Sequence, residues 1–218
     1  MIFTVFEDNN YSSLFPLNLN RTSFELRCGA FTNLERIENL LSPDDTVQLV
    51  VRDELVPLVQ ERFPNIAINP DLLSQGIWLN GAGLWTGKIL KNLTSGKSYT
   101  KNGTVIAMYN NDAIPLSDFH PYLDKANLVS TEIDIQFMEN IWEGIFLQSD
   151  VITSDAKYFI EYNRGKIHPS VAIENGDNIF LGNGSEVCAG SVLDARSGPI
   201  IISENSFIDI GSLIQGPV

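Results

Sequence analysis

Acidic and amide side chains follow two short apolar runs, one at the start of the chain and one near residue 80. Glu7 and Asp8 come directly after the first run, and Asn80 and Gly81 follow the second. Carboxylates in such a position can coordinate a metal ion or accept hydrogen bonds from a nucleobase or ribose. They can also simply cap a turn, as can Asn-Gly. Because ligands of open α/β sheets gather at the carboxyl ends of strands, all four residues are candidate substrate-binding groups.

Two arginines are the candidate phosphate-binding groups. Arg21 and Arg27 stand at the two ends of the segment RTSFELR. A guanidinium group presents a planar fork of donors that matches the oxygens of a phosphate or a carboxylate. The alternative is a pair of surface or structural salt bridges, and the residues alone leave both interpretations open.

The composition narrows the classes of function. The chain has 218 residues, of which 14 are basic and 27 acidic, and its formal net charge is -13. Such a surface repels a phosphate backbone, and no local basic patch interrupts it, so nucleic-acid binding is not expected. Binding to anionic lipid is disfavoured too, and no apolar run approaches the roughly 20 residues that span a bilayer. One or two arginines in a cleft would still suffice for a phosphorylated small molecule.

The N-terminus, the cysteines and the histidines indicate an intracellular setting without a metal framework. The segment MIFTVFEDNN lacks the basic flank and long apolar core of a signal peptide, so a cytoplasmic location is predicted. Cys28 and Cys188 are far apart and have no C-x-x-C spacing, which argues against a disulfide framework or a structural zinc site. Neither His120 nor His168 has the setting of an acyltransferase base.

Strand and helix patterns alternate up to about residue 150. Buried strands are predicted over Ile2–Phe6 and residues 47–51, with shorter ones over residues 66–68 and 77–79. This alternation is typical of an α/β sheet that is mainly parallel.

Two helices and one hairpin complete the pattern of this part. Residues 53–63 predict a helix with Pro57 in its first turn, where proline is tolerated. Apolar residues at helical spacing over residues 135–145 predict a later amphipathic helix. Asn102 and Gly103 predict a tight hairpin turn, because both residues accept a positive φ.

The period of the apolar residues changes to six from about residue 160. Eight aliphatic residues follow this step in three groups: Ile167 and Ile173; Leu181, Val187 and Leu193; and Ile202, Ile208 and Ile214. A six-residue period fits neither a helix nor an ordinary strand, and it is the signature of a parallel β-helix. The aliphatic residues would point into the prism and small residues would turn its corners. The alternative is a β-rich tail with an accidental period.

This domain order resembles the bifunctional sugar-1-phosphate uridyltransferase/acetyltransferase family, and more closely a branch of it described as sugar nucleotidyltransferases. The resemblance rests on LFPLNLNRTSFELRCG at 14–29, IWLNGAG at 77–83 and GPIIISENSFIDIGSLIQGPV at 198–218. It implies a Rossmann-like nucleotidyltransferase-type domain over residues 1–150. A left-handed parallel β-helix would follow over residues 151–218, apparently truncated after its first coils.

The resemblance also implies a reaction. Members of the family transfer a nucleotidyl group from an NTP to a sugar 1-phosphate with Mg²⁺, and Pro16, Leu17 and Arg21 match their P-L-x-x-x-R stretch. Arg21 would then be catalytic, by steadying the phosphates. Three family elements are missing: EDNNYSS replaces the glycine-rich loop, no lysine follows Arg21, and Ala82 replaces the aspartate that holds Mg²⁺.

These departures motivate a second hypothesis, in which the domain is a catalytically degenerate scaffold that binds a nucleotide or sugar. Acyl transfer would then take place in further β-helix coils, where the family binds acetyl-coenzyme A, beyond the residues of this chain. Because the flat sides of such a β-helix typically form trimers, the resemblance also implies a homo-oligomer.

Overall fold

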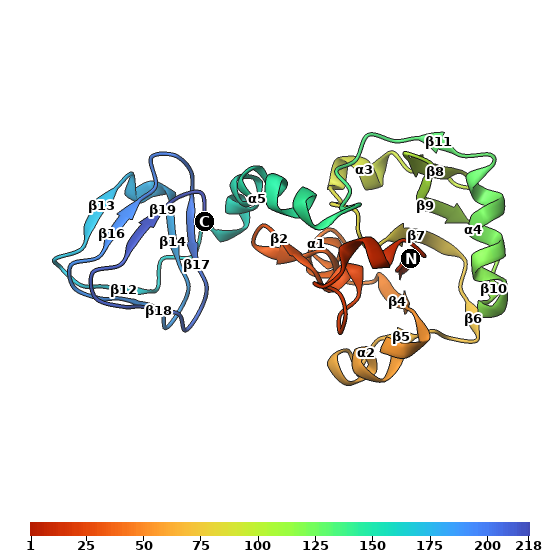
Figure 1. Ribbon diagram of the computed structural model, residues 1–218, viewed down its shortest axis with the longest axis horizontal. Helices are drawn as coiled ribbons and strands as arrows, with labels where there is room; N and C mark the ends of the chain where they lie inside the picture. The colour runs from red at the N-terminus through yellow and green to blue at the C-terminus, as the bar shows by residue number, and fades with distance from the viewer. The chain divides into compact units, whose positions relative to one another are not determined.

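Seven strands of the N-terminal part form one sheet in the order β11-β8-β9-β7-β1-β4-β5 (Figure 1). The computed structural model describes residues 1–218. It divides into two compact units, one made of residues 1–27 and 31–144 and the other of residues 28–30 and 145–218. The strands of the sheet are β1 (Ile2–Phe6), β4 (Thr46–Val50), β5 (Ala67–Ile68), β7 (Gly76–Asn80), β8 (Ser98–Lys101), β9 (Thr104–Asn110) and β11 (Thr131–Glu132).

The centre of this sheet is parallel and one side of it is antiparallel. Strand β1 pairs in parallel with both β4 and β7, and β4 pairs in parallel with β5. Strand β9 runs antiparallel to β7 and returns through a hairpin from β8, whose turn residues Asn102 and Gly103 have φ values of 49° and 78°. The predicted mixed α/β fold with an added hairpin is therefore confirmed.

Four helices lie between the strands along the chain, namely α1 (Asn33–Glu38), α2 (Val56–Arg62), α3 (Gly87–Lys91) and α4 (Phe119–Asn127). A fifth helix, α5 (Ile141–Asp155), follows the last strand of the sheet and belongs mostly to the second unit. Helix α2 has its proline in the first turn, as the sequence predicts. Two small strand pairs lie outside the main sheet, β2 (Arg27–Cys28) with β3 (Phe31–Thr32), and β6 (Leu72–Leu73) with β10 (Ile114–Pro115). No helix is both long and apolar enough to span a membrane.

The late amphipathic helix predicted over residues 135–145 is wrong in its position. Helix α5 begins at Ile141, while Ile135 and Met138 are buried in an extended segment before it. Trp142 and Ile145 are 54% and 72% exposed, so they do not form a core-facing stripe. The segment that contains this buried pair runs beside the loop after β7, where Met138 N donates to Ala82 O at 3.0 Å.

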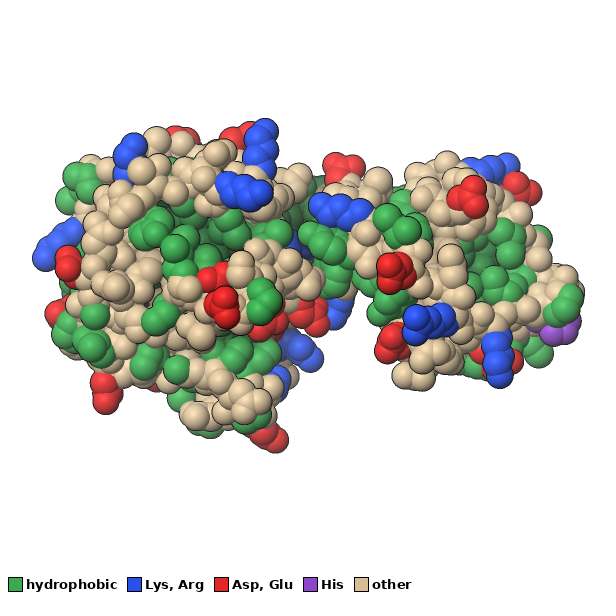
Figure 2. Space-filling view, turned by 180° about the vertical axis from the view of Figure 1, so that it is seen from behind, with side chains coloured by type: hydrophobic (Ala, Val, Ile, Leu, Met, Phe, Trp, Pro, Cys, Tyr) green, Lys and Arg blue, Asp and Glu red, His purple; other side chains and the backbone are tan.

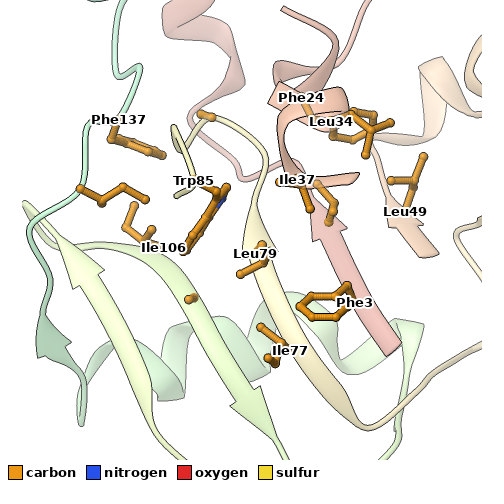
Figure 3. Packing of buried hydrophobic residues seen from close by; sticks show 14 of the residues in the cluster. Phe3, Phe24, Leu34, Ile37, Leu49, Ile77, Leu79, Trp85, Ile106 and Phe137 are labelled. Carbon is orange, nitrogen blue, oxygen red and sulfur yellow. The ribbon is translucent and has the colours of Figure 1, made fainter. Parts of the chain in front are cut away.

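Alternation along the strands divides the core of the sheet between its two faces. Phe3 and Val5 of β1 pack with α1 on one face, together with Leu79 of β7 (Figure 3). Phe6 and Trp78 point to the other face, where they pack against α4. Because each fully buried apolar side chain contributes about 1.5–3 kcal/mol, this two-sided core holds the strand ends in fixed positions.

Residues 166–215 form three short parallel sheets, two of three strands and one of two strands. The strands are β12 (Lys166–Ile167), β13 (Ala172–Glu174), β14 (Ile179–Leu181), β15 (Glu186–Val187), β16 (Val192–Asp194), β17 (Ile200–Ile202), β18 (Phe207–Ile208) and β19 (Leu213–Gln215). The sheets are β12-β15-β18, β13-β16-β19 and β14-β17. The chain therefore winds as three-sided coils that stack on one another.

The apolar residues at six-residue steps meet in register between these coils. Leu181 pairs with Ile202, and Val187 pairs with Ile208. Val187 and Leu193 have no exposed area, whereas Ile208 in the last coil is half-buried. The two paired coils are 21 residues apart, because residues 195–199 form an extra loop between β16 and β17.

Candidate functional site

The topology of the sheet brings three strand ends together at one edge. From β1 the chain goes to β4 and β5 on one side, and then returns to β7 on the other side of β1. Such a switch in strand order leaves a crevice at the carboxyl ends of the central strands. Backbone hydrogen bonds tie the three ends, since Glu7 N donates to Val50 O at 2.9 Å and Gly81 N donates to Phe6 O at 2.8 Å.

A buried ion pair connects the ends of β1 and β4. The guanidinium of Arg52 donates to Glu7 Oε1 at 2.6 Å, and the backbone N–H of Ser23 donates to the same oxygen at 3.0 Å. The side chains of Glu7 and Arg52 are only 1% and 11% exposed. Burial raises the pKa of Glu7, and the hydrogen bond and charge of Arg52 oppose that shift. Glu7 Oε2 is buried without a hydrogen-bond partner in the protein.

Arg52 also holds the loop that follows β1. It donates to the carbonyl oxygen of Asn18, and to that of Arg21 at 3.3 Å. Its guanidinium lies 4.5 Å from the ring centroid of Tyr11, a favourable cation–π contact. A guanidinium with five donors can make all of these contacts at once, which a lysine cannot.

A second glutamate–arginine pair holds the same loop from α2. Arg62 lies 2.5 Å from the buried carboxylate of Glu25, and it donates to Asn20 O at 3.2 Å. The carbonyls at residues 18, 20 and 21 are thus each bound by an arginine. Ion pairs therefore fix the backbone of residues 18–21, in the segment that carries the P-L-x-x-x-R match.

Asp8 and Asn80 form the centre of the crevice. Asn80 has no exposed area, and its Nδ2 donates to Asp8 Oδ2 at 2.8 Å and to Val105 O at 3.1 Å. Its Oδ1 accepts from Ala82 N at 3.0 Å. Burial raises the pKa of Asp8, and the hydrogen bond from Asn80 counteracts this effect. The amide therefore fixes the position of one oxygen of the carboxylate.

Gly81 is required by packing, because a side chain at this position would collide with Phe24. A Cβ on Gly81 would lie 2.7 Å from the Cβ of Phe24. The close approach lets the carbonyl of Gly81 accept from Asn33 Nδ2 at 2.9 Å. Gly81 thus supports the loop around residue 24 through its backbone and offers no side chain to a substrate.

Three hollows surround Asp8. The first measures about 220 Å³ and extends toward Ala82, Phe137 and Met138. The second, of about 270 Å³, is lined by Glu7, Arg52 and other residues that follow β4. The third, of about 210 Å³, lies between residues 103–105 and helix α4. Asp8 is the residue that lines all three.

The structure brings Glu7, Asp8, Asn80 and Gly81 together and leaves the two predicted arginines outside the hollows. Arg21 is exposed on the loop, and none of the three hollows is lined by its side chain. Arg27 is exposed as well, and its guanidinium lies 3.4 Å from Glu35.

Sequence reasoning missed Arg52, Ser23 and His120. Arg52 comes directly after the buried strand predicted over residues 47–51, so the rule that selects residues after buried strands would have found it. His120 is exposed on α4 and lines the second and third hollows. Nothing in its local sequence links it to the crevice, because the packing of α4 against the sheet places it there.

The charged groups around Asp8 are mainly acidic. The second hollow combines Arg52 and His120 with four carboxylates, those of Glu7, Asp8, Asp53 and Glu54. No group of three or more His, Cys, Asp or Glu side chains is arranged to hold a metal ion. Lys and Arg side chains stand singly or in pairs on the face of the molecule shown in Figure 2.

The sheet order defines an α/β domain with a crevice at the carboxyl ends of its central strands, which is where ligands of such folds bind. Residues 3–163 match the family model described as sugar nucleotidyl transferase, and the chain belongs to this family. A comparison with curated proteins finds no match. The family confirms the nucleotidyltransferase part of the resemblance seen in the sequence.

Proposed function

We propose that the protein transfers a nucleotidyl group from an NTP to a sugar 1-phosphate. A phosphate oxygen of the sugar 1-phosphate attacks the α-phosphorus, the bond to the β-phosphate breaks, and pyrophosphate leaves. The observation that carries the proposal is the crevice around Asp8 and Asn80, at the switch point of the sheet, in a member of the sugar nucleotidyl transferase family.

Positioning and charge neutralisation dominate the catalysis of phosphoryl transfer. In this proposal the phosphates lie in the second hollow, where Arg52 and His120 supply positive charge. Arg21 remains the proposed contact that steadies the phosphates, since its backbone carbonyl is held by Arg52 next to that hollow.

Mg²⁺ fits this site as an ion that binds together with the phosphates of the substrate. Proteins commonly bind Mg²⁺ through one or two carboxylates together with phosphate oxygens and waters. The carboxylates of Asp8 and Asp53 line the second hollow and are the groups that would hold it. When bound, the ion would neutralise charge on the transferring phosphoryl group, in a crevice that is otherwise acidic.

A panel of NTPs and sugar 1-phosphates, with coupled detection of pyrophosphate and excess Mg²⁺, tests the proposal. We expect turnover with at least one pair and none when the sugar 1-phosphate is left out. No turnover with any pair at high enzyme concentration would refute the enzymatic function.

A degenerate binding scaffold is the second candidate function. It is favoured by Ala82 at the position of the family's metal-binding aspartate, and by Thr22 and Ser23 where a lysine is expected. Calorimetry distinguishes the two candidates. Saturable micromolar binding of an NTP without turnover supports the scaffold, and turnover excludes it.

For the C-terminal unit we propose a left-handed β-helix of hexapeptide repeats that joins the chains into a homo-oligomer. The parallel stacking of coils and the six-residue step of their buried residues support it. Phe207, Ile210 and Leu213 are 64%, 75% and 80% exposed on the coils, which is an apolar surface that a second copy could cover. Light scattering across a dilution series should give a mass above that of one chain, and a strictly monomeric mass would refute assembly.

A further inference from the structure

The first hollow differs from its neighbour in having no positive charge. Its lining holds no Lys, Arg or His, whereas Arg52 and His120 line the second hollow. Asp8 lines both, and it stands between them. A phosphate group in the first hollow would meet the carboxylates of Asp8 and Glu139 and no compensating cation, so this space suits a part of a ligand that carries no negative charge.

The polar groups of the first hollow are suited to hydroxyl groups of a ligand. Asp8 accepts hydrogen bonds from Asn80 and from Asn10 N at 2.9 Å, and a carboxylate has capacity for about two more. Ser13, Thr104 and Asn140 add hydroxyl and amide groups to the lining. These groups can donate to ring oxygens and accept from hydroxyls, and none of them carries a positive charge.

Ser23 supplies an unused hydrogen-bonding group in the wall of this hollow. The residue is only 3% exposed, and its Oγ has no hydrogen-bond partner in the protein. Its backbone is fixed, because its N–H donates to Glu7 and the next residue, Phe24, packs against Gly81. A buried hydroxyl without a partner is unfavourable, so a ligand that pairs with it gains affinity.

Apolar side chains form the rest of the wall. Leu14, Phe137 and Met138 line the hollow, and all three are at least nine-tenths buried. The ring of Tyr11 lies at its edge and is held in place by Arg52. Apolar and aromatic surface next to a few convergent polar groups is the usual make-up of a small-molecule site. A sugar ring has the matching chemistry, with hydroxyl groups at its rim and C–H groups on its faces.

We propose that the first hollow binds the neutral hydroxylated ring of a substrate, with Asp8 and Ser23 as the residues that recognise its hydroxyl groups. This ring is either the ribose of the NTP or the hexose of the sugar 1-phosphate. The inference rests on the proposed function for the identity of the ligand. The phosphates would lie in the hollow that has cationic side chains, and the neutral ring in the hollow that has none.

Uncharged probes test this site without requiring turnover. Ribonucleosides, 2′-deoxyribonucleosides and methyl hexosides are titrated against the full chain by saturation-transfer NMR. We expect saturable binding by one class. Ribonucleosides that bind better than their deoxy analogues identify the ribose, and methyl hexosides that bind alone identify the hexose. Absence of saturable binding by every probe at tens of millimolar would overturn the proposal.

Variants show whether the binding is at this hollow. Ser23→Ala and Asp8→Asn should each weaken the probe roughly tenfold, which is the effect expected when a hydrogen bond to a buried or charged group is lost. Asp124→Asn, which removes a carboxylate from the third hollow only, is the matched control and should leave the affinity unchanged. Equal affinity in the wild type and in the Ser23 and Asp8 variants would overturn the assignment.

The result is separable from that of the pyrophosphate assay. If no NTP and sugar 1-phosphate pair turns over but an uncharged ring binds in a manner that depends on Ser23, the ring site stands and the enzymatic function fails. If turnover occurs and its KM values do not change in Ser23→Ala, the enzymatic function stands and the ring site is refuted.

Discussion

Single residues at the ends of β1, β4 and β7 form the proposed site, and their burial determines how much each contributes to stability. The side chains of Glu7 and Arg52 are both buried, and the charge of each is compensated by the charge of the other. Removing one partner of such a pair leaves an uncompensated buried charge.

Arg52→Met should therefore lower the free energy of unfolding by about 3–5 kcal/mol, as chemical denaturation measures it. Arg196→Met is the matched control. It disturbs the pair with Asp194, in which the arginine side chain is 67% exposed, and should leave the free energy of unfolding nearly unchanged. A similar small effect for both variants would contradict the role of Arg52 as a buried clamp.

The Asp8 carboxylate should make the native state less stable at neutral pH. Burial raises its folded-state pKa above the ordinary value of 3.8, so the native state binds more protons than the unfolded state between the two pKa values. Stability due to this group therefore falls as the pH rises through that window. Asp8→Asn cannot titrate, so its melting temperature should rise relative to that of the wild type as the pH increases through that window. A difference between the two melting temperatures that stays constant with pH, or that changes in the opposite direction, would contradict the raised pKa.

The sequence predicts some of these residues and not others, for a physical reason. Glu7, Asp8 and Asn80 follow buried strands directly, so topology alone brings them together. The side chain of Arg21 lies on a loop whose course depends on the distant Arg52 and Arg62, and no local pattern encodes that course.

At the scale of elements, strands were easier to predict than helix limits. Buried strands such as β1 and β4 are continuous apolar runs with few alternatives. The apolar residues over 135–145 belong to two different structures, an extended segment in which Ile135 is buried and a helix that starts at Ile141. The spacing of apolar residues does not show where the extended segment ends and the helix begins, because burial of the extended part depends on contacts with the loop after β7.

The stacked coils depend on their inward aliphatic residues. Leu193 has no exposed area and lies in register between Ile173 and Ile214, so Leu193→Ala should cost about 2–5 kcal/mol. Leu128→Ala removes the same atoms from a side chain that is 85% exposed and lies outside the proposed oligomer surface, and it should change stability by less than about 0.5 kcal/mol. Thermal denaturation of the full chain checks both. Equal effects would mean that the coils do not pack around Leu193.

The whole molecule joins a mixed α/β unit to a unit of stacked coils, and both were predictable because their periods differ so plainly. Alternating strands and helices change to a six-residue step near residue 160. The glutamate–arginine pairs that hold the loop after β1 were not predictable, since the pair of Glu7 and Arg52 joins residues 45 positions apart in the chain. The net charge of the chain is -13, so a phosphorylated substrate is repelled by the field of the whole molecule. A cation that binds together with the phosphates would offset this repulsion.

The turnover of Asp8→Asn, compared with that of the wild type and of Asp124→Asn, tests most directly whether the crevice at the end of β1 is the catalytic site. The measurement is kcat/KM for pyrophosphate release with the best NTP and sugar 1-phosphate pair at saturating Mg²⁺. Asp8→Asn should lower kcat/KM by about a hundredfold or more, because the substrate loses the group that orients it between the two hollows, and Asp124→Asn should leave it unchanged. Wild-type turnover in a folded Asp8→Asn variant would contradict the assignment of this crevice as the site of nucleotidyl transfer.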